Sequence, residues 1–352
     1  MAEIARRTGV CKATVSLALR NDPQIPVATR ERIEQAATEL GYTCNPVVAH
    51  LMSELRKTGP ARRSRTIALI NAHENAKAFT LHPTVPIWVA GCQRRAAMLG
   101  YGTDAFWLHD RTITPERLER ILRARGITGL IVLGSFASNH LPERFAPVWT
   151  GFACVVAGVR THQPTFSFCC VDHHTLVVEA VNRALELGYR RPALVIDSGT
   201  DRLVGGRFSS AMWLAQSALP VRDRIPAFLN AEEARRNPQL FQSWYQRYRP
   251  DVVITFYREI RDWLQPCGVR VPQDMGVILL ERTPADKQWA GMDQRNDLAG
   301  EAAVDLLIGM IHGREYGPTE TPRATLVGAQ WIDGPSVRRQ VKRSDGGRAA
   351  SR

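Results

Sequence analysis

A short stretch near the start of the chain places hydrogen-bonding side chains beside small apolar ones. Its spacing predicts a helix from about Lys12 to Arg20. The five side chains that this helix would present outward are Lys12, Ala13, Thr14, Ser16 and Leu17. An amine, two hydroxyls and apolar groups on one face could read base edges in a DNA major groove and hold phosphates. For the two hydroxyls, the alternative is an ordinary solvent-exposed helix surface.

The elements that would position these side chains are two short helices within Glu3–Arg20. Apolar residues recur there at spacings that share one inner face, and Gly9 stands where the chain must reverse sharply. The inner-face residues are Ile4, Ala5, Val10, Val15, Ala18 and Leu19. This pattern is typical of a helix-turn-helix, whose second helix enters the major groove. The alternative is an ordinary helical hairpin.

A third helix is predicted over residues 26–42, and a short helical piece follows Asn45-Pro46. The third helix would turn Ile33, Ala36, Ala37 and Leu40 inward and end at Gly41. Pro46 suits the first position of the following piece, VVAHLMSELR.

Three segments together closely resemble the lactose-repressor (LacI/GalR) family of bacterial transcription regulators. They are GVCKATVSLAL, ATRERIEQAATELGY and NPVVAHLMSELR, in this order and spacing, and the resemblance continues to about Ser336. It implies a helix-turn-helix DNA-binding head at 1–45, a hinge helix at 46–57 and a linker at 58–65. An effector-binding and dimerisation body would follow at 66–336.

The resemblance also implies roles for residues of the head and hinge. The residues expected to read bases are Lys12, Ala13 and Leu17, with Leu17 standing where some relatives have arginine. The residues expected to contact phosphate are Cys11, Thr14, Ser16, Arg20, Thr29 and Arg30. The hinge residues expected in the minor groove are Asn45, Val48 and Leu51, of which Leu51 would wedge between base pairs. The alternative for Leu51, Met52 and Leu55 is an apolar stripe buried on the body.

The amino terminus departs from the family pattern, because the chain begins inside the first helix. No Ser, Thr or Asp precedes Ala2, so the first turn lacks a side-chain cap worth about 1 kcal/mol. We therefore expect that the natural start lies upstream of Met1.

Composition sets wider limits on function. The 352 residues carry a formal net charge of +12, which suits a polyanionic partner, although a basic surface alone would give the same number. The sequence shows no membrane-length apolar run and no secretory signal, so we expect a cytoplasmic protein. Seven scattered cysteines, with neither a CxxC pair nor zinc spacing, predict reduced, mostly buried thiols and no metal or cofactor.

Strand and helix patterns alternate through the body. The predicted strands are 66–70, 104–108, 129–133, 153–156, 166–171, 192–196, 228, 251–255 and 276–280. The predicted helices are 87–99, 116–126, 172–187, 207–219, 238–248, 258–267 and 296–312. This order predicts an α/β fold with two doubly wound parallel sheets, which resembles periplasmic sugar-binding proteins.

Family resemblance places three crossovers between the lobes, near Gln163, Met292 and Leu326. Lobe 1 would comprise about 66–163 and 293–325, and lobe 2 about 164–292 and 326–336. A small ligand would bind in the cleft that hinges between them. The basic tail, 337–352, lacks apolar heptads and is expected to be disordered.

Cleft residues are expected at strand ends and at family positions. They are Asn71, Phe79, Trp107, Arg202, Tyr257 and Glu281. Arg202 opens an RxxG signature whose guanidinium suits hydroxyls or carboxylates, and Glu281 stands where relatives have aspartate. Tyr257 and Arg258 replace a usual Asn-Asp. The aromatic rings could equally be packing.

These patterns predict a sequence-specific transcription regulator, a repressor, that binds a near-palindromic operator as a homodimer. A small-molecule effector, a sugar or related metabolite, would modulate its DNA affinity. The alternative is a solute-binding receptor of the periplasmic type, which would need a secretion signal and no head. The sequence offers no nucleophile elbow, metal motif or GxGxxG, so no enzyme activity is expected.

Overall fold

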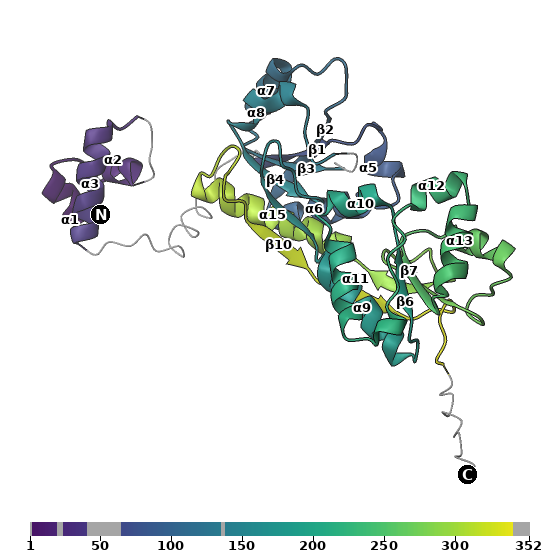
Figure 1. Ribbon diagram of the computed structural model, residues 1–352. Coiled ribbons are helices and arrows are strands. Elements are labelled where there is room, and N and C mark those ends of the chain that lie inside the picture. The colour runs from purple at the N-terminus through teal and green to yellow at the C-terminus, as the bar shows by residue number, and fades with distance from the viewer. Residues whose placement is uncertain (1, 20–23, 41–64, 135–137, 341–352) are drawn as a thin grey trace, which may run out of the picture. The chain divides into compact units, whose positions relative to one another are not determined.

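The computed structural model describes residues 2–19, 24–40, 65–134 and 138–340 (Figure 1). The chain divides into two compact units, Met1–Arg63 and Ser64–Arg352. The described residues of the first unit, 2–19 and 24–40, are called the head, and those of the second unit are called the body.

The head is a cluster of three short helices around a small apolar core. They are α1 (Ala2–Thr8), α2 (Lys12–Ala18) and α3 (Val27–Glu39). The buried core residues are Ile4, Ala5, Val15, Ala18, Ile25, Ile33, Ala36 and Ala37, with Val10, Leu17 and Leu19 packed partly against them. Leu40 was predicted to point inward, but its side chain is 38% exposed, and it follows the last residue of α3.

Lobe 1 of the body is built on a six-stranded parallel sheet, in the order β10-β5-β4-β3-β1-β2. Its strands are β1 (Arg65–Asn71), β2 (Tyr101–Trp107), β3 (Gly129–Leu133), β4 (Ala153–Ala157), β5 (Ser167–Val171) and β10 (Ala324–Val327). Its helices are α5 (Ala78–Leu81), α6 (Val85–Met98), α7 (Pro115–Ala124), α8 (Ala146–Trp149) and α15 (Asn296–Gly313), and a 3-10 turn spans Glu143–Phe145.

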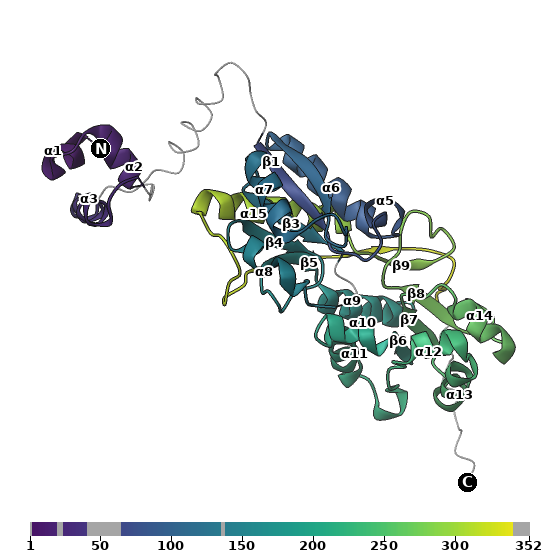
Figure 2. The ribbon, with the colours of Figure 1, turned by 90° about the horizontal axis from the view of Figure 1, so that it is seen from above.

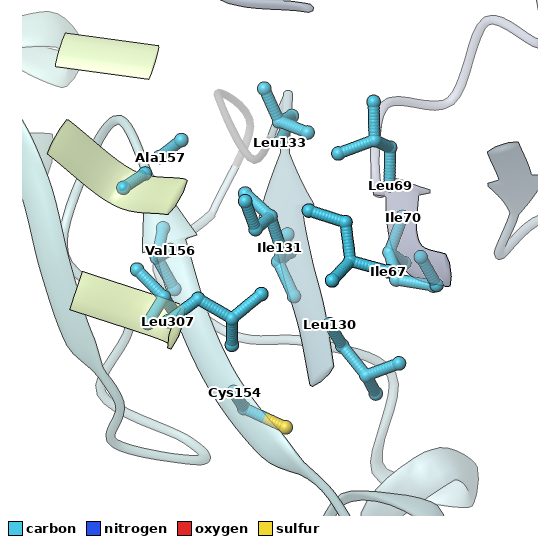
Figure 3. Close-up of a cluster of buried hydrophobic side chains, with 14 of the residues drawn as sticks. Ile67, Leu69, Ile70, Leu130, Ile131, Leu133, Cys154, Val156, Ala157 and Leu307 are labelled. Atoms are coloured by element: carbon cyan, nitrogen blue, oxygen red, sulfur yellow. The ribbon is translucent and has the colours of Figure 1, made fainter. Parts of the chain in front are cut away.

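Continuous apolar runs produce the central strands of this sheet. Every residue of β3 and β4 is buried, as expected for parallel strands covered on both faces. Figure 3 shows part of this core, where Leu307 of α15 packs near Val156 and Ile131. In Figure 1, α7 and α8 lie above the sheet, while α6 and α15 lie below it.

Two glycines allow α6 and α15 to approach closely, and both views show the helices side by side (Figures 1 and 2). A Cβ on Gly91 would stand 2.1 Å from the carbonyl oxygen of Asp297, and one on Gly300 would stand 2.4 Å from that of Trp88. The Cys92 thiol donates to the Gly300 carbonyl at 3.3 Å. Helix α15 is thereby packed tightly onto α6 of lobe 1.

Lobe 2 has a five-stranded sheet in the order β11-β9-β8-β7-β6, parallel except for β11. Its strands are β6 (Pro192–Val195), β7 (Val252–Thr255), β8 (Gly276–Leu279), β9 (Ala290–Asp293) and β11 (Gln330–Ile332). Its helices are α9 (His173–Glu186), α10 (Ser198–Leu203), α11 (Arg207–Ser217), α12 (Ala231–Arg236), α13 (Gln239–Tyr248) and α14 (Ile260–Leu264), with 3-10 turns at Val221–Asp223 and Gln265–Cys267. Helices α9 and α11 pack on one face and α12 and α13 on the other.

The expected first crossover near Gln163, and with it the start of lobe 2 at 164, was wrong. Strand β5 pairs with β4 and with β10, so it belongs to the sheet of lobe 1. The chain enters lobe 2 only after Val171, where α9 begins. The other two crossings follow Asp293 and Val327, since α15 returns to lobe 1 and β11 pairs with β9.

Two further boundaries differ from the expectation. Strand β1 begins at Arg65, one residue inside the predicted linker. Residues 337–340, which were predicted to belong to a disordered tail, are held on lobe 2 by backbone hydrogen bonds. The Gln340 amide donates to the Leu187 carbonyl at 2.7 Å, and the Arg338 amide donates to Tyr189 Oη at 3.1 Å. The rest of the tail lies outside the described residues.

Candidate DNA-binding head and interlobe cavity

The turn between α1 and α2 has the geometry that the sequence predicts. Gly9 has a φ of +67°, and the Val10 amide donates to the Ala5 carbonyl at 3.1 Å, which ends α1. Arg7 of α1 forms an ion pair with Glu39 of α3 at 3.3 Å, and buried apolar groups fill the space between the helices. Helices α1 and α3 thus hold α2 at a fixed angle and leave one face of α2 exposed.

Cys11 caps the start of α2 in place of the more common serine or aspartate. Its Sγ accepts from the Thr14 amide at 3.4 Å and lies 3.1 Å from Thr14 Oγ1. These bonds lower the pKa of the exposed Cys11 thiol. Both residues are therefore engaged in starting the helix, beside the outward face that carries Lys12.

The head residues predicted to contact DNA are exposed to different degrees. Lys12 and Ala13 are exposed, whereas Thr14 and Leu17 are half-buried, and Leu17 packs partly on the head core. On α3, Thr29 and Arg30 are half-buried, and Arg30 Nε is buried with no hydrogen-bond partner among the described residues. The side chain of Ser16, with Arg20, Asn45, Val48 and Leu51, lies outside what the structure describes.

The interlobe cavity opens at the carboxyl ends of the two sheets, where the strand order reverses. In the sheet of lobe 1 (sheet 1), β1 lies between β2 and β3. In the sheet of lobe 2 (sheet 2), Val195 of β6 pairs with β7 on one side and with Phe228 on the other. Ligands bind at such reversal points in doubly wound sheets. The cavity has a volume of about 430 Å³ and is lined by Ser138, Asn139, His140, Asp197, Gly199, Thr200, Arg202, Leu203 and Glu232.

Both lobes contribute polar groups to this cavity, and one contact crosses it. Asn139 of lobe 1 donates to the Leu203 carbonyl of lobe 2 at 2.9 Å and to the Arg160 carbonyl at 2.7 Å. Asp197 caps α10, accepting from the Gly199 amide at 2.7 Å. The lining offers hydroxyls, an amide, two carboxylates and the exposed guanidinium of Arg202, a set that suits a polar ligand.

Arg202 is the residue of the six predicted cleft residues that lines this cavity. Asn71 is buried, and its side chain bonds to the loop that follows. It donates to the carbonyls of Asn75 and Ala76 and accepts from the His73 amide. Phe79 packs on the core of lobe 1. Trp107 is half-buried, and its Nε1 donates to the His73 carbonyl at 2.9 Å.

Tyr257 and Glu281 are also engaged with protein partners. Tyr257 Oη accepts from the Asp197 amide at 2.9 Å, and burial raises the pKa of this phenol. Glu281 Oε1 accepts from Asn296 Nδ2 at 3.1 Å, and Thr84 also bonds this carboxylate. Because Thr84 and Asn296 belong to lobe 1, Glu281 ties the two lobes together.

Sequence reasoning missed most of the cavity lining. Ser138, Asn139 and His140 follow β3, and Asp197 and Thr200 follow β6. Their position after buried strands was the available signal, but the family signature drew attention to other strand ends. Glu232 could not be found in this way, since it lies in the short helix α12, which the sequence pattern did not predict.

Among the described residues, no three or more His, Cys, Asp and Glu side chains form a group that could hold a metal ion. Among the described helices, none is both long enough and apolar enough to cross a bilayer.

A helix-turn-helix head joined to two parallel-sheet lobes with a polar cavity between them defines the class of ligand-responsive DNA-binding regulators. Residues 1–45 match the family described as bacterial regulatory proteins, lacI family, and residues 181–337 match the periplasmic binding protein-like domain. The chain thus carries the amino-terminal domain of the lacI family of bacterial regulatory proteins together with a periplasmic binding protein-like body.

Characterised relatives align along most or half of the chain. The transcriptional regulator CelR of Thermobifida fusca is 24% identical over 90% of this chain and 92% of its own. The transcriptional repressor CytR of Escherichia coli K12 is 26% identical over 54% of this chain and 51% of its own. These relatives are transcription regulators.

Solved structures share the fold. A CelR–cellobiose complex superposes with a TM-score of 0.56 at 21% identity, covering 95% of this chain and 98% of that one. The lac repressor dimer bound to operator and the anti-inducer ONPF gives 0.55 at 19% identity, with the same coverage.

Proposed function

We propose that this protein is a transcriptional repressor that binds a near-palindromic operator as a homodimer and changes its DNA affinity when a small molecule occupies the interlobe cavity. The observation that carries this proposal is the head itself. Its buried core fixes α2 while leaving Lys12 and Ala13 exposed on one face. The protein would act in the cytoplasm, where its DNA target lies, and no catalytic step is assigned to it.

The head would use different residues to read and to hold DNA. Lys12 would donate to guanine, Ala13 and Leu17 would contact thymine methyl groups, and Arg30 would contact phosphate. A phosphate oxygen would supply the partner that buried Arg30 Nε lacks among the described residues. In the hinge, Leu51 would wedge into the minor groove, so Leu51→Ala should weaken operator binding.

The body would couple the cavity to the head through the angle between its lobes. The hydrogen bonds of Asn139 with Leu203 and of Glu281 with Asn296 each join one lobe to the other. A ligand that favoured or opposed these contacts would shift the lobe angle and thus the distance between the hinges of a dimer. Such couplings are typically about 1 to 3 kcal/mol and are reciprocal.

We propose a polar effector of the sugar or related metabolite class, since the cavity lining contains both hydrogen-bond donors and acceptors. The CelR–cellobiose complex, which shares the fold, supports this class without identifying the molecule. The predicted boundaries of the head at 45 and of the hinge at 57 are retained as part of the proposal.

Genome-wide binding with purified, tagged full-length protein tests the proposal. We expect a small number of strong sites that share a two-fold symmetric motif, and neighbouring genes that point to the effector. The metabolite implied by those genes should change the affinity in a fluorescence-anisotropy titration. A protein that prefers no genomic site over random competitor, with or without metabolites, would be a receptor or another kind of binder.

A further inference from the structure

Six arginines gather at the edge of sheet 2 where β6 and β7 begin. Arg190 and Arg191 immediately precede β6, and Arg247 and Arg249 precede β7. The cavity lies beyond the opposite ends of these strands, since Asp197 follows β6. The distal arginine cluster is defined as Arg190, Arg191, Arg222, Arg224, Arg247 and Arg249.

Arg191 lies at the centre of this cluster and joins its segments. Its Nη1 donates to the Arg222 carbonyl at 2.7 Å, and its Nε donates to the Arg249 carbonyl at 3.2 Å. Three separate loops are therefore held around one guanidinium. The fold therefore fixes the side chain of Arg191 and, through it, the backbone that carries Arg222 and Arg249.

Positive charge at this end exceeds the negative charge that contacts it. In the described part of the chain, the only ion pairs of these six arginines are with Asp223, which lies 3.5 Å from Arg191 and 3.9 Å from Arg222. Asp251 accepts from the backbone amides of Arg190 and Arg191 at 2.7 and 2.9 Å. Six guanidinium groups and two carboxylates leave an excess of four positive charges.

Most of the cluster is accessible, and aromatic rings support part of it. Arg191 is half-buried and the other five arginines are exposed, with the Arg222 side chain 86% exposed. Arg247 Cζ stands 5.3 Å from the centre of the Tyr248 ring, and Arg249 Cζ stands 5.4 Å from that of Tyr245. Stacked guanidinium groups keep their donor forks free for phosphate oxygens.

The C-terminal segment reaches the same end of lobe 2. The Gln340 amide bonds the Leu187 carbonyl and the Arg338 amide bonds Tyr189 Oη, and both partners lie just before Arg190 in the sequence.

We propose that the distal arginine cluster binds the phosphates of duplex DNA without sequence preference, so that one molecule can hold a second DNA segment. A nucleic acid fits better than an acidic protein, because protein interfaces are depleted of charge at their centres and this cluster is charged throughout. The inference goes beyond the proposed function and does not rest on specific operator binding. If both hold, the head would raise the local DNA concentration at the cluster.

A bridging experiment on the full-length protein tests this. A 30-base-pair random duplex is fixed on beads, protein is added, and retention of a second, fluorescent random duplex is measured against salt. The triple variant Arg190→Gln, Arg222→Gln, Arg247→Gln should retain at least about tenfold less second duplex than the unaltered protein. Its log-log salt slope should be shallower by about 0.9 for each phosphate that the variant no longer neutralises.

Two control variants make the result decisive. The matched variant Arg111→Gln, Arg117→Gln, Arg120→Gln, which removes three exposed arginines of lobe 1, should bridge like the unaltered protein. Replacing Arg190, Arg222 and Arg247 by lysine should preserve most bridging and would show that the defect of the glutamine variant is not misfolding.

Equal bridging by the unaltered protein and the cluster glutamine variant would overturn the proposal. Cluster-dependent binding of fluorescent polyglutamate without cluster-dependent bridging would also overturn it and would assign the surface to an acidic protein. Failure of the proposed function is distinguishable, because a protein with no preferred genomic site would still lose random-duplex bridging in the cluster glutamine variant.

Discussion

Glu281 of lobe 2 accepts a hydrogen bond from Asn296 of lobe 1, with 3.1 Å between Oε1 and Nδ2. Burial raises the pKa of this carboxyl above its ordinary value. The folded protein therefore holds a proton that the unfolded chain has already released, in the interval between the ordinary and the raised pKa. Stability should fall as the pH rises through that interval, and the full contribution should be present below it.

Glu281→Gln removes this titration while leaving an oxygen that can accept from Asn296. The free energy of unfolding of the variant should improve relative to the unaltered protein as the pH rises from about 4 to about 7, measured by urea denaturation at each pH. Glu143→Gln, which removes an exposed carboxylate, is the control for the change in net charge. A constant difference between Glu281→Gln and the unaltered protein across this range would contradict the assignment.

Replacing glycine by alanine should have opposite effects on stability at two positions of α15. Gly300→Ala should destabilise lobe 1 by about 1 to 3 kcal/mol, because the added methyl group meets the Trp88 carbonyl of α6. Gly309→Ala has no neighbour within 4 Å of the new Cβ and should stabilise the helix by about 0.5 to 1 kcal/mol. Thermal and urea unfolding give both values, and two changes of the same sign would argue against the close packing of α6 and α15.

Asn139→Ala removes the two hydrogen bonds that its amide makes to the carbonyls of Arg160 and Leu203. A destabilisation of about 1 kcal/mol per bond is expected in urea denaturation. Small-angle X-ray scattering should also show a larger radius of gyration for the body, since one contact between the lobes is gone. Asn237→Ala, at an exposed position that ends α12, is the control. Unchanged stability and scattering in Asn139→Ala would show that this contact does not hold the lobes.

Lys12 and Arg30 should affect DNA binding in different ways. Lys12→Ala should cost about 1 to 3 kcal/mol of discrimination at one base pair of each half-site. Arg30→Gln should weaken all sequences about equally and make the salt slope shallower by about 0.9. Anisotropy titrations with single-base operator variants at several salt concentrations separate the two, and the reverse assignment would follow if Arg30→Gln alone changed base preference.

Local sequence patterns were enough to predict most elements of the body. The runs 129–133 and 192–196 are apolar and short, so burial on both faces follows directly from composition. Membership of a sheet could not be derived in this way. Strand β5 joins lobe 1 partly through β10, whose residues lie more than 150 positions later and are mostly exposed. The short helices α10 and α12 carry too few residues to give a periodic signal.

The helices and the turn of the head were predictable from the sequence, whereas the lining of the cavity was predictable only in part. Gly9 and the apolar spacing of α1 and α2 specify the turn locally, so residues such as Lys12 could be placed from the sequence. Asn71 and Glu281 were predicted to bind the ligand, yet neither lines the cavity, and the hydrogen bonds of both side chains go to protein partners. From the sequence alone, a polar side chain that bonds to the protein itself cannot be told from one that is available to a ligand.

The return of α15 and β10 to lobe 1 has a consequence for biosynthesis. Val304, Leu307 and Met310 of α15 complete the apolar interior of a lobe whose first strand begins at Arg65. A ribosome must therefore translate roughly 240 residues after that strand before the lobe can close. Until then the emerging polypeptide exposes an apolar surface that chaperones would have to cover. Premature termination before Asn296 would leave a product that proteases degrade.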